Sequence, residues 1–175
     1  MKTGKFEAVL STELADLHEA ETQIVKALPK MIAAASSEEL AQAFQDHLDQ
    51  TKEQVRRLES IFESMGEQPG SGRSEGIGGL VQETERIITE LEKTAALDAA
   101  LIGAAQKVEH YEIAGYRTAR AIAEVLGQQE TAELLQETLD EEIAADEALE
   151  TLAEKVLTGS SSGGDASITS SGARG

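Results

Sequence analysis

Side chains of types that bind metal ions interrupt apolar stripes in four separate segments of this chain. The interrupting residues are Glu21, His47, Glu109, Glu112 and Glu142. Each stands three or four residues from apolar neighbours, as Glu21 does from Leu17 and Ile24, and this spacing places it on the same helix face as those neighbours. The pattern therefore predicts carboxylates and an imidazole that point into a helical core, and a metal site is the chemistry that they indicate.

The individual segments support this prediction in different ways. Glu109 and Glu112 lie one helical turn apart, so both can contact one ligand. His47 follows Phe44 on an otherwise apolar stripe. Asp146 lies one turn beyond Glu142 on nearly the same face, and we expect it at the periphery of the site. Tyr116, one turn beyond Glu112, is expected to serve core packing.

The positions of these residues along their segments agree with a common site. Glu21 lies about 14 residues before a turn near residue 35, Gln50 lies about 15 residues after it, and His47 lies one helical turn from that level. Glu112 lies about 16 residues before a second turn near residue 128, and Glu142 about 14 residues after it. Partners in each helical hairpin therefore meet at similar heights.

Composition indicates an all-helical protein with one domain. The chain has 175 residues, only 3% aromatic residues and two prolines, and it is rich in residues that favour helices. Its formal net charge of −18 would repel phosphates and anionic lipids, so we expect neither nucleic acid nor a membrane surface as a partner. It has no cysteine, which excludes disulfides and thiolate ligands. The N-terminus lacks a secretory signal pattern, and a cytoplasmic location is expected.

The order of the segments predicts a ferritin-like four-helix bundle. Helices are expected at about residues 3–35, 37–65, 96–126 and 130–157, with a shorter additional helix at about 80–93. Ser36 and Glu39 have the spacing of a capping box, and Pro29 is expected to kink or break the first helix. A glycine-rich connection at 66–79 would cross the bundle between two antiparallel hairpins. The domain is expected to span residues 1–157, followed by a disordered Ser/Gly-rich tail at 158–175.

Over about residues 5–157, the sequence resembles a known family, the ferritin-like YciE/YciF proteins of bacteria. The resemblance rests on several stretches taken together, namely Asp16–Gln23, Ala27–Met31, Phe44–Thr51, Ala104–Ile113 and Leu134–Glu142 with Asp146. It implies a ferritin-like helical protein that is often a dimer, is linked to stress conditions and binds metal.

The main hypothesis is a di-metal carboxylate site that holds iron or, as second choice, manganese. Two divalent cations would offset the charge of four buried glutamates, and carboxylates with one imidazole suit these metals. Glu21 and Glu142 would be terminal ligands, Glu109 and Glu112 paired or bridging ligands, and His47 the ligand from the second helix. Oxidation of Fe(II) by oxygen or peroxide is the chemistry to test. Phe44 stands where the usual motif has a glutamate. Either Gln50 or Asp49 substitutes for it, or the site is asymmetric or holds a single metal ion.

The alternative is a protein without enzymatic activity that serves stress protection or interaction with other proteins. Its buried acids would then be protonated or paired with trapped water, and the polar layer would fix the register of the helices. Stability measurements with and without metal separate the two hypotheses.

Overall fold

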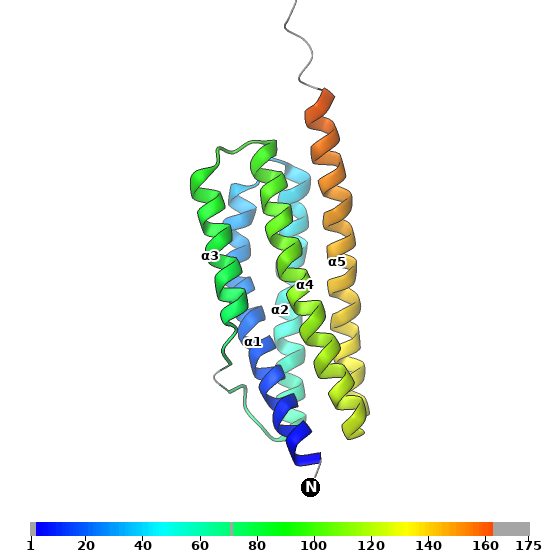
Figure 1. Ribbon diagram of the computed structural model, residues 1–175. Coiled ribbons are helices and arrows are strands. Elements are labelled where there is room, and N and C mark those ends of the chain that lie inside the picture. Colours follow the sequence, from blue (N-terminus) through cyan, green and yellow to red (C-terminus); the bar gives the residue numbers. More distant parts are fainter. Residues whose placement is uncertain (1–2, 71, 163–175) are drawn as a thin grey trace, which may run out of the picture.

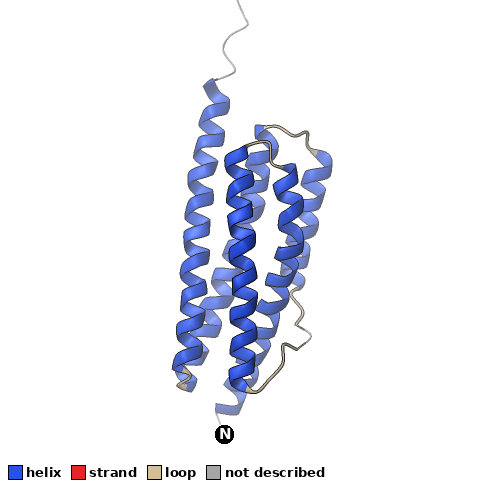
Figure 2. Cartoon of the chain, turned by 180° about the vertical axis from the view of Figure 1, so that it is seen from behind, coloured by secondary structure: helices blue, strands red, loops and turns tan. Residues whose placement is uncertain are grey.

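The computed structural model describes residues 3–70 and 72–162, and within these ranges it contains helices and no strands (Figure 2). The helices are α1 (Thr3–Ala34), α2 (Glu38–Met65), α3 (Glu75–Glu90), α4 (Ala95–Leu126) and α5 (Gln129–Ser162). The predicted all-helical class is confirmed. No helix in the described part of the chain combines the length and the apolar character that a membrane crossing requires.

The helices form a ferritin-like four-helix bundle, as predicted, with α3 as the additional helix. Helices α1 and α2 form one antiparallel hairpin, α4 and α5 form the other, and the two hairpins pack through α1 against α4 and α2 against α5. Helix α3 packs on the outside of the bundle against α1 and α4 (Figure 1). The 16-residue α3, about 24 Å long, does most of the crossing that sequence analysis assigned to a loop.

The predicted glycine-rich loop at 66–79 is too long, because its last residues are helical. Helix α3 begins at Glu75 and contains Gly76, Gly78 and Gly79. A Cβ atom on Gly76 would lie only 2.6 Å from Tyr111 Cε2, so the glycine allows α3 to approach α4 closely. This glycine therefore serves packing between helices. In the sequence alone, a glycine of this kind is easily mistaken for a residue of a turn.

Two other local predictions differ from the structure. Helix α1 continues through Pro29 without the predicted break, because Leu28 and Met31 on either side remain anchored in the core, and the predicted kink stays a prediction. Ser37 is the N-cap of α2, and its hydroxyl accepts a hydrogen bond from Leu40 N, in place of the predicted cap at Ser36. The predicted helix ends at Gly66 and Gly127 are confirmed, with φ values of 71° and 73°.

Ser36 has a different partner, the buried carboxylate of Asp98 at the start of α4. Asp98 Oδ1 accepts a hydrogen bond from Ser36 N at 2.7 Å, and Asp98 Oδ2 accepts bonds from Ser36 Oγ at 2.5 Å and Ser37 N at 3.0 Å. Asp98 is only 2% exposed. This contact, which we call the Asp98 clamp, joins the α1–α2 turn to the other hairpin.

The interior consists of two apolar clusters separated by a polar layer. One cluster lies toward the α1–α2 turn and includes Leu28, Phe44, Leu101 and Leu149. The other lies toward the α4–α5 turn and includes Leu14, Phe62, Tyr116 and Leu135. The polar layer between them holds the residues that sequence analysis assigned to a metal site.

Helix α5 extends past the predicted end of the domain. It continues from residue 157 through Ser162 and projects beyond the other helices (Figure 1). Within this extension, the side-chain hydroxyl of Thr158 donates a hydrogen bond to Glu154 O, one turn earlier in the helix. The rest of the predicted disordered tail, residues 163–175, lies outside the described residues.

Candidate metal centre

Glu109 and Glu112 project from α4 into the polar layer. Their neighbours on the same face are Ala105, in the cluster toward the α1–α2 turn, and Tyr116, in the other cluster. Because these apolar neighbours fix the inward face of α4, the two carboxyl groups are carried into the core. Glu109 is 2% exposed and Glu112 is 0% exposed.

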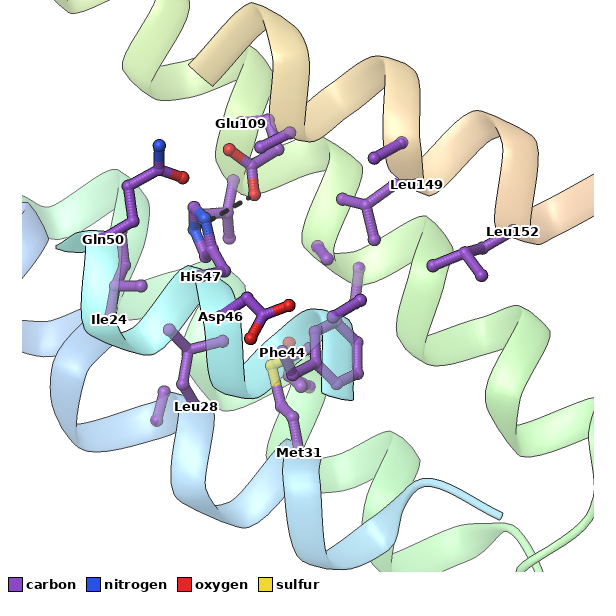
Figure 3. A pocket seen from close by; sticks show the side chains of 18 of the residues that line it. Ile24, Leu28, Met31, Phe44, Asp46, His47, Gln50, Glu109, Leu149 and Leu152 are labelled. Carbon is purple, nitrogen blue, oxygen red and sulfur yellow. Dashed lines mark ion pairs between the residues drawn. The ribbon is translucent and has the colours of Figure 1, made fainter. Parts of the chain in front are cut away.

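The other helices of the bundle bring their candidates to the same level. His47 of α2 and Glu142 of α5 join Glu109 and Glu112, and one ligand-type atom from each residue lies within 4.8 Å of those of the other three. We call these four residues the ligand cluster. His47 Nε2 lies 3.3 Å from Glu109 Oε1, and Figure 3 shows the two side chains facing each other.

Glu21 of α1 is also fully buried, but it lies beside the ligand cluster and is not part of it. Its Oε1 accepts a hydrogen bond of 2.5 Å from the hydroxyl of Tyr116. Burial raises the pKa of Glu21 well above its usual value, and the negative charge of Glu142 raises it further. Tyr116 is thus a core residue, as expected, and also a hydrogen-bond donor to a predicted ligand.

Asp146 makes its contacts outside the ligand cluster. Its Oδ1 accepts a hydrogen bond from Gln106 Nε2 at 3.3 Å, and its Oδ2 lies 3.0 Å from His110 Nε2. Of the two residues proposed to substitute for a glutamate on α2, Asp49 is exposed and pairs with Lys52, whereas Gln50 lines a cavity beside His47.

Sequence analysis missed Gln54, a buried partner of the ligand cluster. Gln54 is 0% exposed, and its Nε2 donates hydrogen bonds to Glu142 Oε1 and, at 3.1 Å, to Glu141 Oε2. Gln54 was not considered because it is polar, and the neighbouring Val55 is only half-buried. A signal was present, because Gln54 follows His47 by seven residues, the spacing that returns a helix to the same face.

Arg57 is the second residue near the acids that sequence analysis missed. Its Nη1 donates to Glu141 Oε2 at 2.9 Å and its Nη2 to Glu141 Oε1 at 3.0 Å. Nη1 also donates to Thr138 Oγ1, and Nη2 to Glu137 Oε1. Arg57 therefore pairs with acids at the edge of the polar layer, while its charge lowers the pKa of Glu142.

Burial dominates the electrostatics of the ligand cluster. It raises the pKa of Glu109 and Glu112 well above the usual value, and neighbouring carboxylates add to this effect. Burial also raises the pKa of Glu142 to about 7 and lowers the pKa of His47 to about 4. Without a cation, burial therefore favours the protonated form of these carboxyl groups and the uncharged form of His47.

Several buried atoms of the layer have no hydrogen-bond partner, although nearly all buried polar atoms in proteins have one. These atoms are Glu21 Oε2, His47 Nδ1 and Nε2, Glu109 Oε2, Glu112 Oε1 and Oε2, and Glu142 Oε2. They are the atom types that ligate divalent metal ions. The residues therefore fit a metal ion.

Sequence comparisons identify a family and a relative of this chain. The family described as Domain of unknown function (DUF892) matches residues 5–160. Protein YciF of Escherichia coli is 44% identical over 135 residues, which cover 77% of this chain and 80% of YciF.

Solved structures of related proteins have a similar fold. The crystal structure of YciF, which is described as a stress protein of Escherichia coli, has a TM-score of 0.84 and 42% identity, covering 87% of this chain and 97% of that one. YcfI of Rhodopseudomonas palustris has a TM-score of 0.80 and 41% identity, covering 83% of this chain and 93% of that one. A Xanthomonas campestris protein with 19% identity and a TM-score of 0.71, covering 90% of this chain and 96% of that one, shares the fold. The chain belongs to the YciF family, which carries the domain of unknown function DUF892.

Proposed function

We propose that the polar layer binds two divalent metal ions, with iron as first choice and manganese as second. The observation that carries this proposal is the set of unpartnered carboxylate and imidazole atoms that converge from three helices. Oxygen ligands with one imidazole, and no thiolate, suit iron and manganese better than a structural zinc ion. The resemblance of the chain to a stress protein agrees with a redox-active metal.

The arrangement of the acids supports two positions for metal. The ligand cluster supplies three carboxylates and His47, which is enough for one ion. Glu21 interacts with Glu112 and Glu142, and its unpartnered Oε2 offers a ligand for a second ion shared with those two residues. Two divalent cations would balance the charge of these four glutamates.

Bound iron would supply electron transfer, in which two Fe(II) ions give two electrons to dioxygen or to a peroxide as oxidant. The residues of the chain would contribute geometry and protons. Tyr116 holds one oxygen of Glu21, and Gln54 holds one oxygen of Glu142, so both carboxylates keep a free oxygen. Because the raised carboxyl pKa values keep protons in the empty site, metal binding releases them.

The test is metal content after anaerobic loading with Fe(II) or Mn(II), measured by inductively coupled plasma mass spectrometry. We expect about two ions per chain in the wild type and at most about one in Glu112→Gln and Glu142→Gln. Glu150→Gln is the matched control, because Glu150 is an exposed glutamate on α5. Wild-type metal content in both buried variants would refute the ligand assignment.

A structural role without metal is the second candidate function. It is supported by the hydrogen bonds of Tyr116 to Glu21 and of Gln54 to Glu142, which hold the layer together without a cation. In this case Fe(II) and Mn(II) would leave the melting temperature unchanged. A metal that binds the folded state selectively must raise it.

A further inference from the structure

A large cavity lies next to the ligand cluster, on the side toward the α1–α2 turn. Its volume is about 450 Å³, and residues of all five helices line it. His47, Gln50 and Glu109 lie together at one end, whereas Leu149 and Leu152 lie at the other (Figure 3). The exposed residues Asp46, Ala144 and Ala148 border it, so the cavity opens to solvent between α2 and α5.

The space exists because alanines line the wall where a bundle core usually has larger side chains. The lining alanines come from four of the helices and are Ala27, Ala43, Ala104, Ala105, Ala144, Ala145 and Ala148. Bound water needs two to four polar partners, and the alanine and leucine wall offers none. The volume is within the range of small-molecule sites, about 300 to 1,000 Å³. An apolar ligand therefore suits the far end better than water does.

The near end of the cavity has free polar atoms but no positive charge. Glu109 is 2% exposed, and its Oε2 has no hydrogen-bond partner. His47 Nδ1 also has no hydrogen-bond partner. The lining includes no lysine or arginine. An anionic head group would meet carboxyl groups there without a cation to compensate.

The other acids of the lining already have partners. Asp46 Oδ1 accepts a hydrogen bond from Gln42, and Glu141 pairs with Arg57 and Gln54. No lining acid outside the ligand cluster therefore requires a cationic head group. An uncharged head group that can donate a hydrogen bond fits these surroundings.

We propose that this cavity binds an uncharged amphiphile with a single aliphatic chain and a hydroxyl-type head group. The chain lies along the alanine wall toward Leu152, and the head group donates a hydrogen bond to Glu109 Oε2. At about 30 Å³ for each water-sized group, the cavity has room for about fifteen such groups. This proposal does not rest on the proposed metal function, since every protein atom that would contact the amphiphile lines the cavity of the metal-free protein.

The experiment follows methionine methyl signals by NMR in the metal-free full-length protein, with 1-decanol as the probe. Met31 lines the cavity, whereas Met65 packs against the other apolar cluster and is an internal control. We expect the Met31 methyl signal to shift saturably and the Met65 signal to stay in place. An unchanged Met31 signal, or equal shifts of both signals, would overturn the proposal.

Two variants and two further probes sharpen the test. Ala145→Leu fills part of the cavity, and we expect it to weaken binding by about tenfold or more, because the added carbons occupy the volume of the ligand chain. Ala121→Leu, on the exposed face of α4, is the matched control and should bind like the wild type. Decanoate and decylammonium should bind more weakly than 1-decanol. Equal binding of either ion, or unchanged affinity in Ala145→Leu, would contradict the assignment.

Discussion

Replacement of Glu142 by glutamine should change the pH dependence of stability in the metal-free protein. The pKa of Glu142 is raised from 4.5 to about 7, chiefly by burial. The folded protein thus keeps a proton that the unfolded chain releases at lower pH. The contribution of this carboxyl to the free energy of unfolding therefore falls as the pH rises from 4.5 to about 7. At about 1.4 kcal/mol per pKa unit, the loss is about 3 kcal/mol. Glutamine has no such titration and accepts the same hydrogen bond from Gln54.

The free energy of unfolding of Glu142→Gln, relative to wild type, should therefore rise by about 3 kcal/mol between about pH 5 and about pH 8.5. For a chain of this size, that corresponds to about 6 to 12 °C in melting temperature. His47 acts in the opposite direction, because burial lowers its pKa from 6.5 to about 4. Its contribution to the free energy of unfolding therefore rises as the pH rises from about 4 to 6.5. This contribution is common to both proteins and cancels in the comparison.

The assay is thermal unfolding followed by circular dichroism in the presence of a chelator, across this pH range. Glu150→Gln removes an exposed carboxyl of the same helix and should follow the wild-type curve. Parallel pH profiles for wild type and Glu142→Gln would refute the reasoning that burial keeps this carboxyl protonated. With metal present, the wild type should be more stable than Glu142→Gln, because the variant has lost a metal ligand.

Three further predictions concern packing and hydrogen bonds. Gly76→Ala should lower the free energy of unfolding by about 1 to 3 kcal/mol, because its Cβ would meet the Tyr111 ring, whereas Gly79→Ala, with open space at its Cβ position, should raise it by about 0.5 to 1 kcal/mol. Both are measured by urea unfolding. Asp98→Ala should cost about 3 kcal/mol in the same assay, because three hydrogen-bond donors lose their acceptor. Gln54→Leu should weaken Mn(II) affinity by about tenfold or more in calorimetric titrations, and unchanged affinity would show that this side chain does not orient a ligand.

The bundle and most of the polar layer could be predicted because helical periodicity is a local signal. Leucines at spacings of three and four define an inward face, and an acid on that face, such as Glu112, must be buried with them. The helix ends at Gly66 and Gly127 were equally readable, because only glycine readily takes the left-handed conformation that ends these helices.

The errors arise where contacts between helices override local signals. Pro29 remains inside a helix because tertiary packing holds both flanks, and Gly76 is helical because Tyr111 of another helix occupies the adjacent space. Gln54 and Arg57 contact α5, and the sequence of α2 alone does not show which of its polar residues do so.

The division of the ligand cluster between the two hairpins has a kinetic consequence. His47 comes from the α1–α2 hairpin, and the three glutamates of the ligand cluster come from the α4–α5 hairpin. Contacts within a hairpin are short in sequence separation and form early, whereas docking of the hairpins closes a long loop and is slower. We therefore expect the complete coordination sphere to assemble in the last folding step, so that the rate of metal capture during refolding reports on hairpin docking.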